Sequence, residues 1–139
     1  MTNPATLAVG DSALPRKFGP MTRQMFVKYA GASGDFNPMH YDDDLARGAG
    51  NPSVFSQGMH QTALLATFAT DWLGAVNIRR FQVRFQNQVW PGDILTCSGT
   101  VVGVNESKEG AVVTVDLTCT RQTGDVAISG SADFAVSAP

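Results

Sequence analysis

Cysteine and histidine are scarce in this sequence, which holds two of each among its 139 residues. Cys97 and Cys119 form no C-x-x-C pair and stand in separate apolar segments. This pattern favours buried free thiols in a reducing compartment. The chain therefore offers neither a disulfide framework nor the ligand spacing of a structural zinc site.

Charge is also low, at 16% of residues, and the formal net charge is −2. The ten Lys and Arg are scattered, except for the neighbours Arg16-Lys17 and Arg79-Arg80, so no basic stripe favours nucleic acid as a partner. A surface poor in charge is compatible with one that a partner chain partly covers.

Long apolar runs and a basic leader are missing as well. The start, Met1 to Ala5, has no signal-like pattern, and the apolar stretch Gly58 to Leu73 is too short and too rich in Thr, Gln and His to span a bilayer. The sequence thus predicts a cytoplasmic protein that occupies residues 1–139 as a single domain.

Two helices and one short helical turn are predicted in the first half. Thr22 is a good N-cap for a helix that ends at Gly31 and Gly34, and Asp42 to Asp44 place carboxylates at the start of a short turn. A helix from Gly58 to Leu73 follows, with Ser56 as its cap and Gly74 as its stop. It lacks Lys, Arg and Glu, which predicts burial nearly all round, as in a helix wrapped by a sheet.

The second half predicts four strands. Residues 80–89 alternate between apolar and polar side chains, and turns at 90–93, 105–110 and 122–125 separate the strands at 94–104, 111–121 and 126–136. Consecutive strands at this spacing predict an antiparallel meander, and one helix packed on that sheet makes an α+β fold.

The candidate active site lies between the first two helices. Pro38 removes a backbone N–H, so residues 35–40 cannot be helical and the chain must turn sharply there, which brings the side chains of Asp35 and His40 toward one point. An Asp that is ionised near neutral pH, beside an imidazole that titrates there, is a usable base and acid pair. The unpaired N–H of Gly58, at the start of the buried helix, suits a developing oxyanion.

Each of these features has a structural alternative. Asp and Asn in such turns often only cap neighbouring N–H groups. A metal held by Asp35, His40, Asp42 and His60 is disfavoured, because their spacing matches no standard ligand set. Gly31-x-x-Gly34 follows a helix instead of a strand, so it is no dinucleotide loop, and no Ser-centred nucleophile elbow is present.

Two further groups are candidate substrate-binding residues. His60 and Gln61 stand in the first turn of the long helix and face either the pocket or solvent and core. Arg84, on the polar face of the first long strand with Arg79 and Arg80, would meet the phosphates of a large substrate. A solvated strand face is the alternative for these arginines.

Residues 29–42, Tyr-Ala-Gly-Ala-Ser-Gly-Asp-Phe-Asn-Pro-Met-His-Tyr-Asp, resemble the hydratase-2 motif of the MaoC-like dehydratases, the R-specific enoyl-CoA hydratases. Ser56-Gln57-Gly58-Met59 and the strand Val83-Arg84-Phe85 before Pro91-Gly92-Asp93 match the same family. The resemblance covers nearly the whole chain. It implies a hot-dog fold, in which an antiparallel sheet wraps a long central helix.

The resemblance also implies the chemistry. The family's catalytic Asp falls on Asp35, its His on His40 and its oxyanion N–H on Gly58, while Asn37 holds the loop. Asn37 and Gln57 are also expected among the substrate-binding residues. These residues would hydrate a trans-2-enoyl-CoA reversibly to the (R)-3-hydroxyacyl-CoA by sharing one water. Asp35 is the favoured base, although the sequence leaves open which residue takes the proton. No metal or redox cofactor is implied, and coenzyme A enters as part of the substrate.

The sequence departs from the family near the long helix. Gln57 replaces the usual His, His60 stands where an apolar residue is usual, and Ala63 stands where some members carry Ser. The catalytic pair is intact, but a bulky or polar acyl group becomes a possible substrate.

Four functions follow from the sequence: a homodimeric enoyl-CoA hydratase, an acyl-carrier-protein dehydratase, either alone or paired with a related hot-dog chain, a hot-dog thioesterase, and a non-catalytic acyl-thioester-binding partner. Free-thiol release would identify the thioesterase, and loss of activity in Asp35→Asn without loss of fold would exclude the non-catalytic partner.

Overall fold

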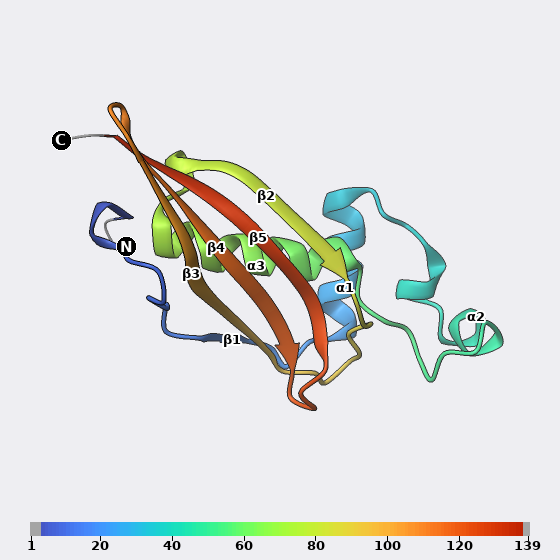
Figure 1. Cartoon of the computed structure of the whole chain (residues 1–139). Coiled ribbons are helices and arrows are strands. Elements are labelled where there is room, and N and C mark those ends of the chain that lie inside the picture. The colour runs from blue at the N-terminus through green and yellow to red at the C-terminus, as the bar shows by residue number, and fades with distance from the viewer. Residues whose placement is uncertain (1–3, 138–139) are drawn as a thin grey trace.

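The computed structural model describes residues 4–137, which form a five-stranded antiparallel sheet around one long helix. In chain order the elements are η1 (Pro4–Thr6), β1 (Arg16–Phe18), α1 (Arg23–Ser33), η2 (Pro38–His40), α2 (Asp43–Gly48), α3 (Gly58–Leu73), η3 (Ala75–Asn77), β2 (Ile78–Phe85), β3 (Leu95–Ser107), β4 (Gly110–Arg121) and β5 (Val126–Ser137). The sheet crosses over α3, whereas α1 and α2 lie beyond one end of it (Figure 1). This arrangement confirms the predicted α+β hot-dog fold.

The strand order is β1-β3-β4-β5-β2. Hairpins join β3, β4 and β5 into a meander, as the sequence predicts, but β2 pairs with β5 and not with its successor β3. The prediction of a four-strand meander in sequence order was therefore wrong for β2. The residues between β2 and β3 carry the chain back across the sheet, so they do not form a tight hairpin.

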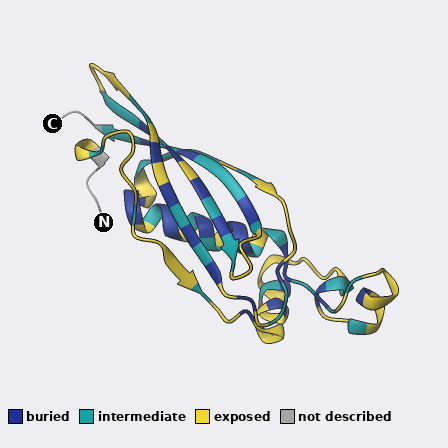
Figure 2. Cartoon of the chain, turned by 60° about the horizontal axis from the view of Figure 1, so that its bottom comes forward, coloured by how far each residue is buried: buried dark blue, intermediate teal, exposed yellow. Residues whose placement is uncertain are grey.

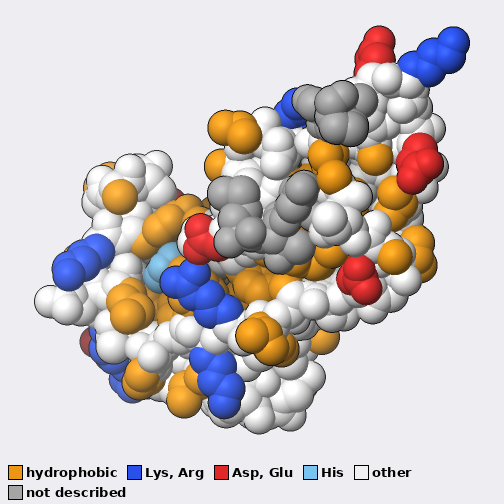
Figure 3. All heavy atoms as spheres, turned by 90° about the vertical axis from the view of Figure 1, so that its left-hand side faces the viewer, with side chains coloured by type: hydrophobic (Ala, Val, Ile, Leu, Met, Phe, Trp, Pro, Cys, Tyr) orange, Lys and Arg blue, Asp and Glu red, His pale blue; other side chains and the backbone are white. Residues whose placement is uncertain are grey.

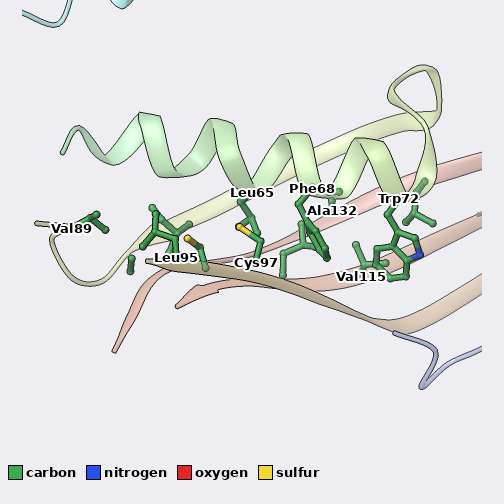
Figure 4. Close-up of a cluster of buried hydrophobic side chains, with 14 of the residues drawn as sticks. Leu65, Phe68, Trp72, Val89, Leu95, Cys97, Val115 and Ala132 are labelled. Atoms are coloured by element: carbon green, nitrogen blue, oxygen red, sulfur yellow. The ribbon is translucent and has the colours of Figure 1, made fainter. Parts of the chain in front are cut away.

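The core lies between α3 and the inner face of the sheet. Leu65, Phe68 and Trp72 extend from α3 toward the strands that carry Cys97 and Val115 (Figure 4). Burying large apolar side chains in this way contributes roughly 1.5–3 kcal/mol each. Gly99 permits the close approach, because a Cβ there would lie 3.0 Å from both Trp72 and Leu117.

The two cysteines belong to this core. Cys97 and Cys119 face each other in the β3–β4 register, and both are buried and free. The structure thus confirms buried free thiols.

One side of α3 remains exposed, contrary to the prediction that the helix is buried nearly all round. Every fourth residue from the second position lies on that side: Met59, Ala63, Thr67 and Asp71. The other residues of α3 are buried or half-buried. Along the strands, buried residues alternate with more exposed ones (Figure 2). The sequence does not reveal this exposed side of the helix, because only one of its four residues, Asp71, carries a charge.

Helix ends follow the sequence in part. Thr22 caps α1 through the amide of Met25 at 3.2 Å, as predicted. Gly34 ends this helix with φ of 77°, but Gly31 lies inside it and does not end it. The helix α3 has the predicted bounds and the predicted stop at Gly74. Its N-cap is Gln57, with no side-chain cap, so the prediction that Ser56 caps it was wrong.

No helix within residues 4–137 is long and apolar enough to cross a membrane.

Candidate active site

The loop after α1 is fixed by the side chains of its own polar residues. Asp35 accepts the amide N–H of Asn37 at 3.3 Å, and Asn37 accepts that of Met39 at 3.1 Å. Pro38 then opens η2, a single 3-10 turn that ends at His40. The prediction that this segment has no helical residues was therefore wrong, because proline is tolerated where the first N–H of a turn needs no partner.

The loop also has an anchor outside itself. Arg23 of α1 donates to Asp43 of α2 at 2.7 Å, and the same carboxylate accepts the amide of Val54 at 3.1 Å. The hydrogen bond from Arg23 lowers the pKa of Asp43, so the carboxylate stays ionised at neutral pH. Residues 34–42 are thus held between two helices and the segment that leads to α3.

The loop brings Asp35 and His40 together. Asp35 Oδ2 lies 3.6 Å from His40 Nε2, and His40 Nδ1 lies 2.7 Å from the carbonyl oxygen of Phe55. A carbonyl oxygen only accepts, so Nδ1 carries the proton and Nε2 of the neutral ring is an acceptor. Two acceptors therefore face each other, and one water can donate to both.

Exposure differs between the two residues. The His40 side chain is 8% exposed and that of Asp35 is 45% exposed. His40 is thus the buried member of the pair, held by the carbonyl of Phe55, and Asp35 is the member that faces solvent.

Phe55 connects this pair to a cavity. Its ring contacts that of His40 edge to face, with centroids 5.2 Å apart, and it also lines a cavity of about 300 Å³. Gly58, Gln61 and Phe85 line the same cavity. Phe55 therefore links the Asp35–His40 pair to the start of α3.

Gly58 is the first residue of α3, and its N–H has no hydrogen-bond acceptor within residues 4–137. The positive end of the helix dipole adds to the attraction of that N–H for an oxyanion. A Cβ at this position would lie 2.7 Å from the nearest ring carbon of Phe85. Glycine is thus what permits the Phe85 ring to cover the helix start.

The predicted substrate-binding residues lie in different places. Asn37 caps the catalytic loop. Gln57 is 1% exposed and donates to the carbonyl of Phe26 at 2.9 Å, so its side chain ties α3 to α1. The His60 ring stacks on Tyr29, with centroids 4.9 Å apart.

Arg84 lies on the other face of the sheet. It lines a polar groove of about 400 Å³ with Asp116, Ser129 and Ser131, separate from the cavity at Gly58. On the face shown in Figure 3, Lys and Arg side chains stand apart, with hydrophobic side chains between them.

Sequence reasoning missed Phe55 and Phe85 as parts of the site. Phe85 reads as a core residue of an alternating strand, yet it is 56% exposed because β2 ends there. The only sequence signal that Phe55 belongs to the site was its position just before Ser56 and Gly58. Gln61, which lines the cavity, was a candidate together with His60.

Within residues 4–137, no three His, Cys, Asp or Glu side chains lie close enough together to hold a metal ion. What the arrangement can do is exchange protons with a bound water and hold an oxyanion at a helix N-terminus.

Known proteins resemble this chain in sequence. The model of the MaoC like domain matches residues 5–123. The 3-oxo-4,17-pregnadiene-20-carboxyl-CoA hydratase beta subunit of Mycobacterium tuberculosis is 30% identical over 100 residues, covering 71% of this chain and 74% of that protein. The peroxisomal hydratase-dehydrogenase-epimerase of Saccharomyces cerevisiae is 35% identical over 89 residues, 62% of this chain, but the match spans only 9% of that protein.

The fold agrees with a solved structure. The ChsH1-ChsH2 complex from Mycobacterium tuberculosis superposes with a TM-score of 0.81 at 25% identity, covering 93% of this chain and 98% of that one. The family match, the hot-dog fold and the facing Asp and His agree, and the chain belongs to the MaoC-like family of hydratases and dehydratases.

Proposed function

We propose that this protein hydrates trans-2-enoyl-CoA thioesters reversibly to (R)-3-hydroxyacyl-CoA. The observation that carries the proposal is the distance of 3.6 Å between Asp35 Oδ2 and His40 Nε2, with Nδ1 of the same ring tied to a carbonyl. This geometry presents two proton acceptors to one water. The (R) configuration rests on the resemblance of residues 29–42 to the hydratase-2 motif.

In the hydration direction the shared water attacks C3 of the enoyl group. Its proton passes to Asp35, the favoured base, while the water oxygen becomes the 3-hydroxyl. The ring proton of His40 stays on Nδ1, so the proton that C2 receives is the one taken from the water, passed on by His40 Nε2, and both residues end as they began. The roles of Asp35 and His40 reverse in dehydration.

The thioester carbonyl needs its own partner, because negative charge develops on its oxygen when C3 is attacked. The free N–H of Gly58 can donate to that oxygen at the positive end of α3. Hydration involves no net oxidation or reduction, so it needs no redox cofactor. Protein side chains carry out both proton transfers.

Coenzyme A enters as part of the substrate, and an acyl carrier protein is the alternative carrier. The same hydration chemistry then runs as dehydration of a 3-hydroxyacyl chain. Comparing the two thioesters of one acyl group would decide between the carriers.

The partner is a second hot-dog chain, either a copy of this one or a related subunit. One relative is described as a beta subunit, and the matched solved structure is a complex, which supports a partner without naming it. Mass measurement of the purified protein in native buffer distinguishes a homodimer from a chain that waits for its partner.

The experiment follows enoyl absorbance with crotonyl-CoA and then a longer enoyl-CoA, with Asp35→Asn and His40→Ala variants beside the wild type. Loss of absorbance, an (R)-alcohol product and two inactive variants support the proposal. Release of free thiol would indicate a thioesterase instead. A folded wild type that leaves both substrates unchanged would contradict a hydratase that acts alone on these chains.

A further inference from the structure

Gln61 differs from the other amide side chains around the cavity at Gly58. Its side chain belongs to α3, is only 2% exposed and still lines the cavity. The other amides there, Gln86, Asn87 and Gln88, are all exposed at the rim. A buried amide inside a cavity is a directional group that a ligand can meet.

Hydrogen bonds fix how this amide is turned. Ser56 Oγ lies 3.0 Å from Gln61 Oε1 and 3.3 Å from His60 Nδ1. Because Oε1 can only accept, the Ser56 hydroxyl donates to it, and His60 Nδ1–H donates to the hydroxyl oxygen. The amide nitrogen of Gln61 is then the free end of the side chain, and it donates to no acceptor within residues 4–137.

No charged side chain accompanies this hydrogen-bond donor in the cavity, because no Lys, Arg, Asp or Glu is among its lining residues. A carboxylate buried there would lack a cation, which is costly, whereas a neutral oxygen needs only a hydrogen bond. The volume of about 300 Å³ corresponds to roughly ten water-sized groups.

We propose that Gln61 Nε2 selects acyl groups that carry a neutral oxygen, a ketone or hydroxyl, beyond the reacting double bond. This inference rests on the proposed function for the identity of the thioester. Ser56 acts as a positioning residue, because its hydroxyl keeps the amide nitrogen turned toward the cavity.

The helix sets where that oxygen lies. Gln61 is three residues after Gly58, about 4.5 Å farther along α3 at about 1.5 Å per residue. With the thioester carbonyl at the Gly58 N–H, the selected oxygen lies a few carbons beyond C3. Crotonyl-CoA is too short to carry it.

The test uses saturated thioesters, which bind but cannot be hydrated. Heptanoyl-CoA and 6-oxoheptanoyl-CoA are titrated calorimetrically into the purified full chain. The wild type is expected to bind the keto compound about tenfold more tightly, since a site with a buried donor discriminates against an analogue that lacks the acceptor.

Variants test whether Gln61 causes the preference for the keto thioester. Gln61→Leu should abolish it, and Ser56→Ala should reduce it by freeing the amide to turn. Gln24→Leu is the matched control, because Gln24 is exposed on α1 away from the cavity. Thermal unfolding checks that each variant is folded, and Gln61→Met replaces Gln61→Leu if the latter does not fold.

Equal binding of the two thioesters by the wild type, or a keto preference that survives in Gln61→Leu, would overturn the inference. Turnover is measured separately on 2-heptenoyl-CoA and 6-oxo-2-heptenoyl-CoA. Hydration of both without a binding preference refutes only the role of Gln61. A binding preference without any hydration supports Gln61 and refutes the proposed reaction.

Discussion

Asp35 and His40 face each other through two acceptor atoms, Oδ2 and Nε2, which lie 3.6 Å apart. The distance is too long for a direct hydrogen bond, and the proton on Nδ1 is committed to the Phe55 carbonyl at 2.7 Å. A water between them would be held by both of its protons, with its oxygen lone pairs free to attack. The pair is thus arranged for water and not for mutual neutralisation.

Removing either acceptor should abolish hydration while preserving the fold. Asp35→Asn and His40→Asn are each expected to lower kcat by about 10²–10⁴-fold, the usual contribution of a positioned acid or base. The measurement is loss of enoyl absorbance at saturating crotonyl-CoA. Thermal unfolding of each variant shows whether the loss reflects chemistry alone.

Asp44→Asn provides the matched control, because Asp44 is exposed on α2 close to the loop and its carboxylate forms no hydrogen bond or ion pair within residues 4–137. Its kcat should equal that of the wild type. Activity in Asp35→Asn comparable to this control would exclude the carboxylate from the reaction.

Gly58→Ala should affect activity more than stability. The added Cβ would lie 2.7 Å from the Phe85 ring, but that ring is 56% exposed and can turn outward. We expect a change in unfolding free energy within about 1 kcal/mol. The methyl group and the displaced ring narrow the cavity, so kcat/KM should fall at least about tenfold.

A double variant tests this explanation. Phe85→Leu in the Gly58→Ala background gives the methyl group room and should recover part of kcat/KM. Gly48→Ala on α2 is the control, because a Cβ there meets nothing within 4 Å. If Gly58→Ala is fully active, the helix start does not approach the substrate.

The loop of residues 34–42 could largely be predicted from the sequence because its signals are local. Pro38, the cap residues Asp35 and Asn37 and the glycine stop at Gly34 act within a few positions of one another. The end of α3 was likewise set by a neighbouring residue, Gly74, whereas its start has no side-chain cap. Local steric rules decide such features without knowledge of the tertiary fold.

The sheet order and the cavity could not be predicted in this way. The alternation in 80–89 identifies a strand but not its neighbour, and β2 pairs with β5 because the helix must be enclosed. The exposure of Phe85 and the burial of Gln57 depend on where β2 ends and where α1 packs. Those positions are set by contacts between segments far apart in the chain.

Asn37→Ala should slow the reaction by loosening the turn before His40. The lost hydrogen bond from the Met39 amide, now 3.1 Å, is a cap whose removal costs about 1 kcal/mol locally. We expect kcat to fall with a small change in melting temperature. Asn37→Ser keeps an acceptor oxygen and should recover activity; equal loss in both variants would point to another role for the amide.

Acidification should weaken the fold through His60. Burial lowers the pKa of this imidazole below its ordinary value of 6.5. The unfolded chain then binds a proton below about pH 6.5 that the folded chain resists, so unfolding free energy falls as pH drops through this window. Urea titrations at pH 7.5 and 5.5 should show a smaller decrease in His60→Phe, which keeps the stacking on Tyr29. An identical decrease in both proteins would assign it elsewhere.

Asp93 and Arg121 form a buried ion pair that holds the turn before β3 against the end of β4. Arg121 Nε and Nη2 lie 2.6 Å and 3.2 Å from the two carboxylate oxygens, and the Asp93 residue is 3% exposed. Burial acts to raise the pKa of Asp93, but hydrogen bonds from Arg121, the Trp90 amide and Gln122 outweigh it and lower the pKa. The pair thus contributes stability that is present at neutral pH and is lost as pH falls below about 3.8.

Arg121→Met leaves that carboxylate buried without its cation and should cost about 3–5 kcal/mol in urea unfolding at pH 7. Arg80→Met is the matched control: Arg80 binds Asp133 at 2.7 Å and 3.2 Å in the same two-pronged geometry, but its side chain is 39% exposed against 15% for Arg121. Water screens the exposed pair, so this variant should lose at most about 1 kcal/mol. Equal losses would mean that burial adds nothing to the Asp93 pair. A larger loss in Arg121→Met that shrinks below pH 3.8 would tie it to the ionised carboxylate, because protonation removes the charge that the arginine compensates.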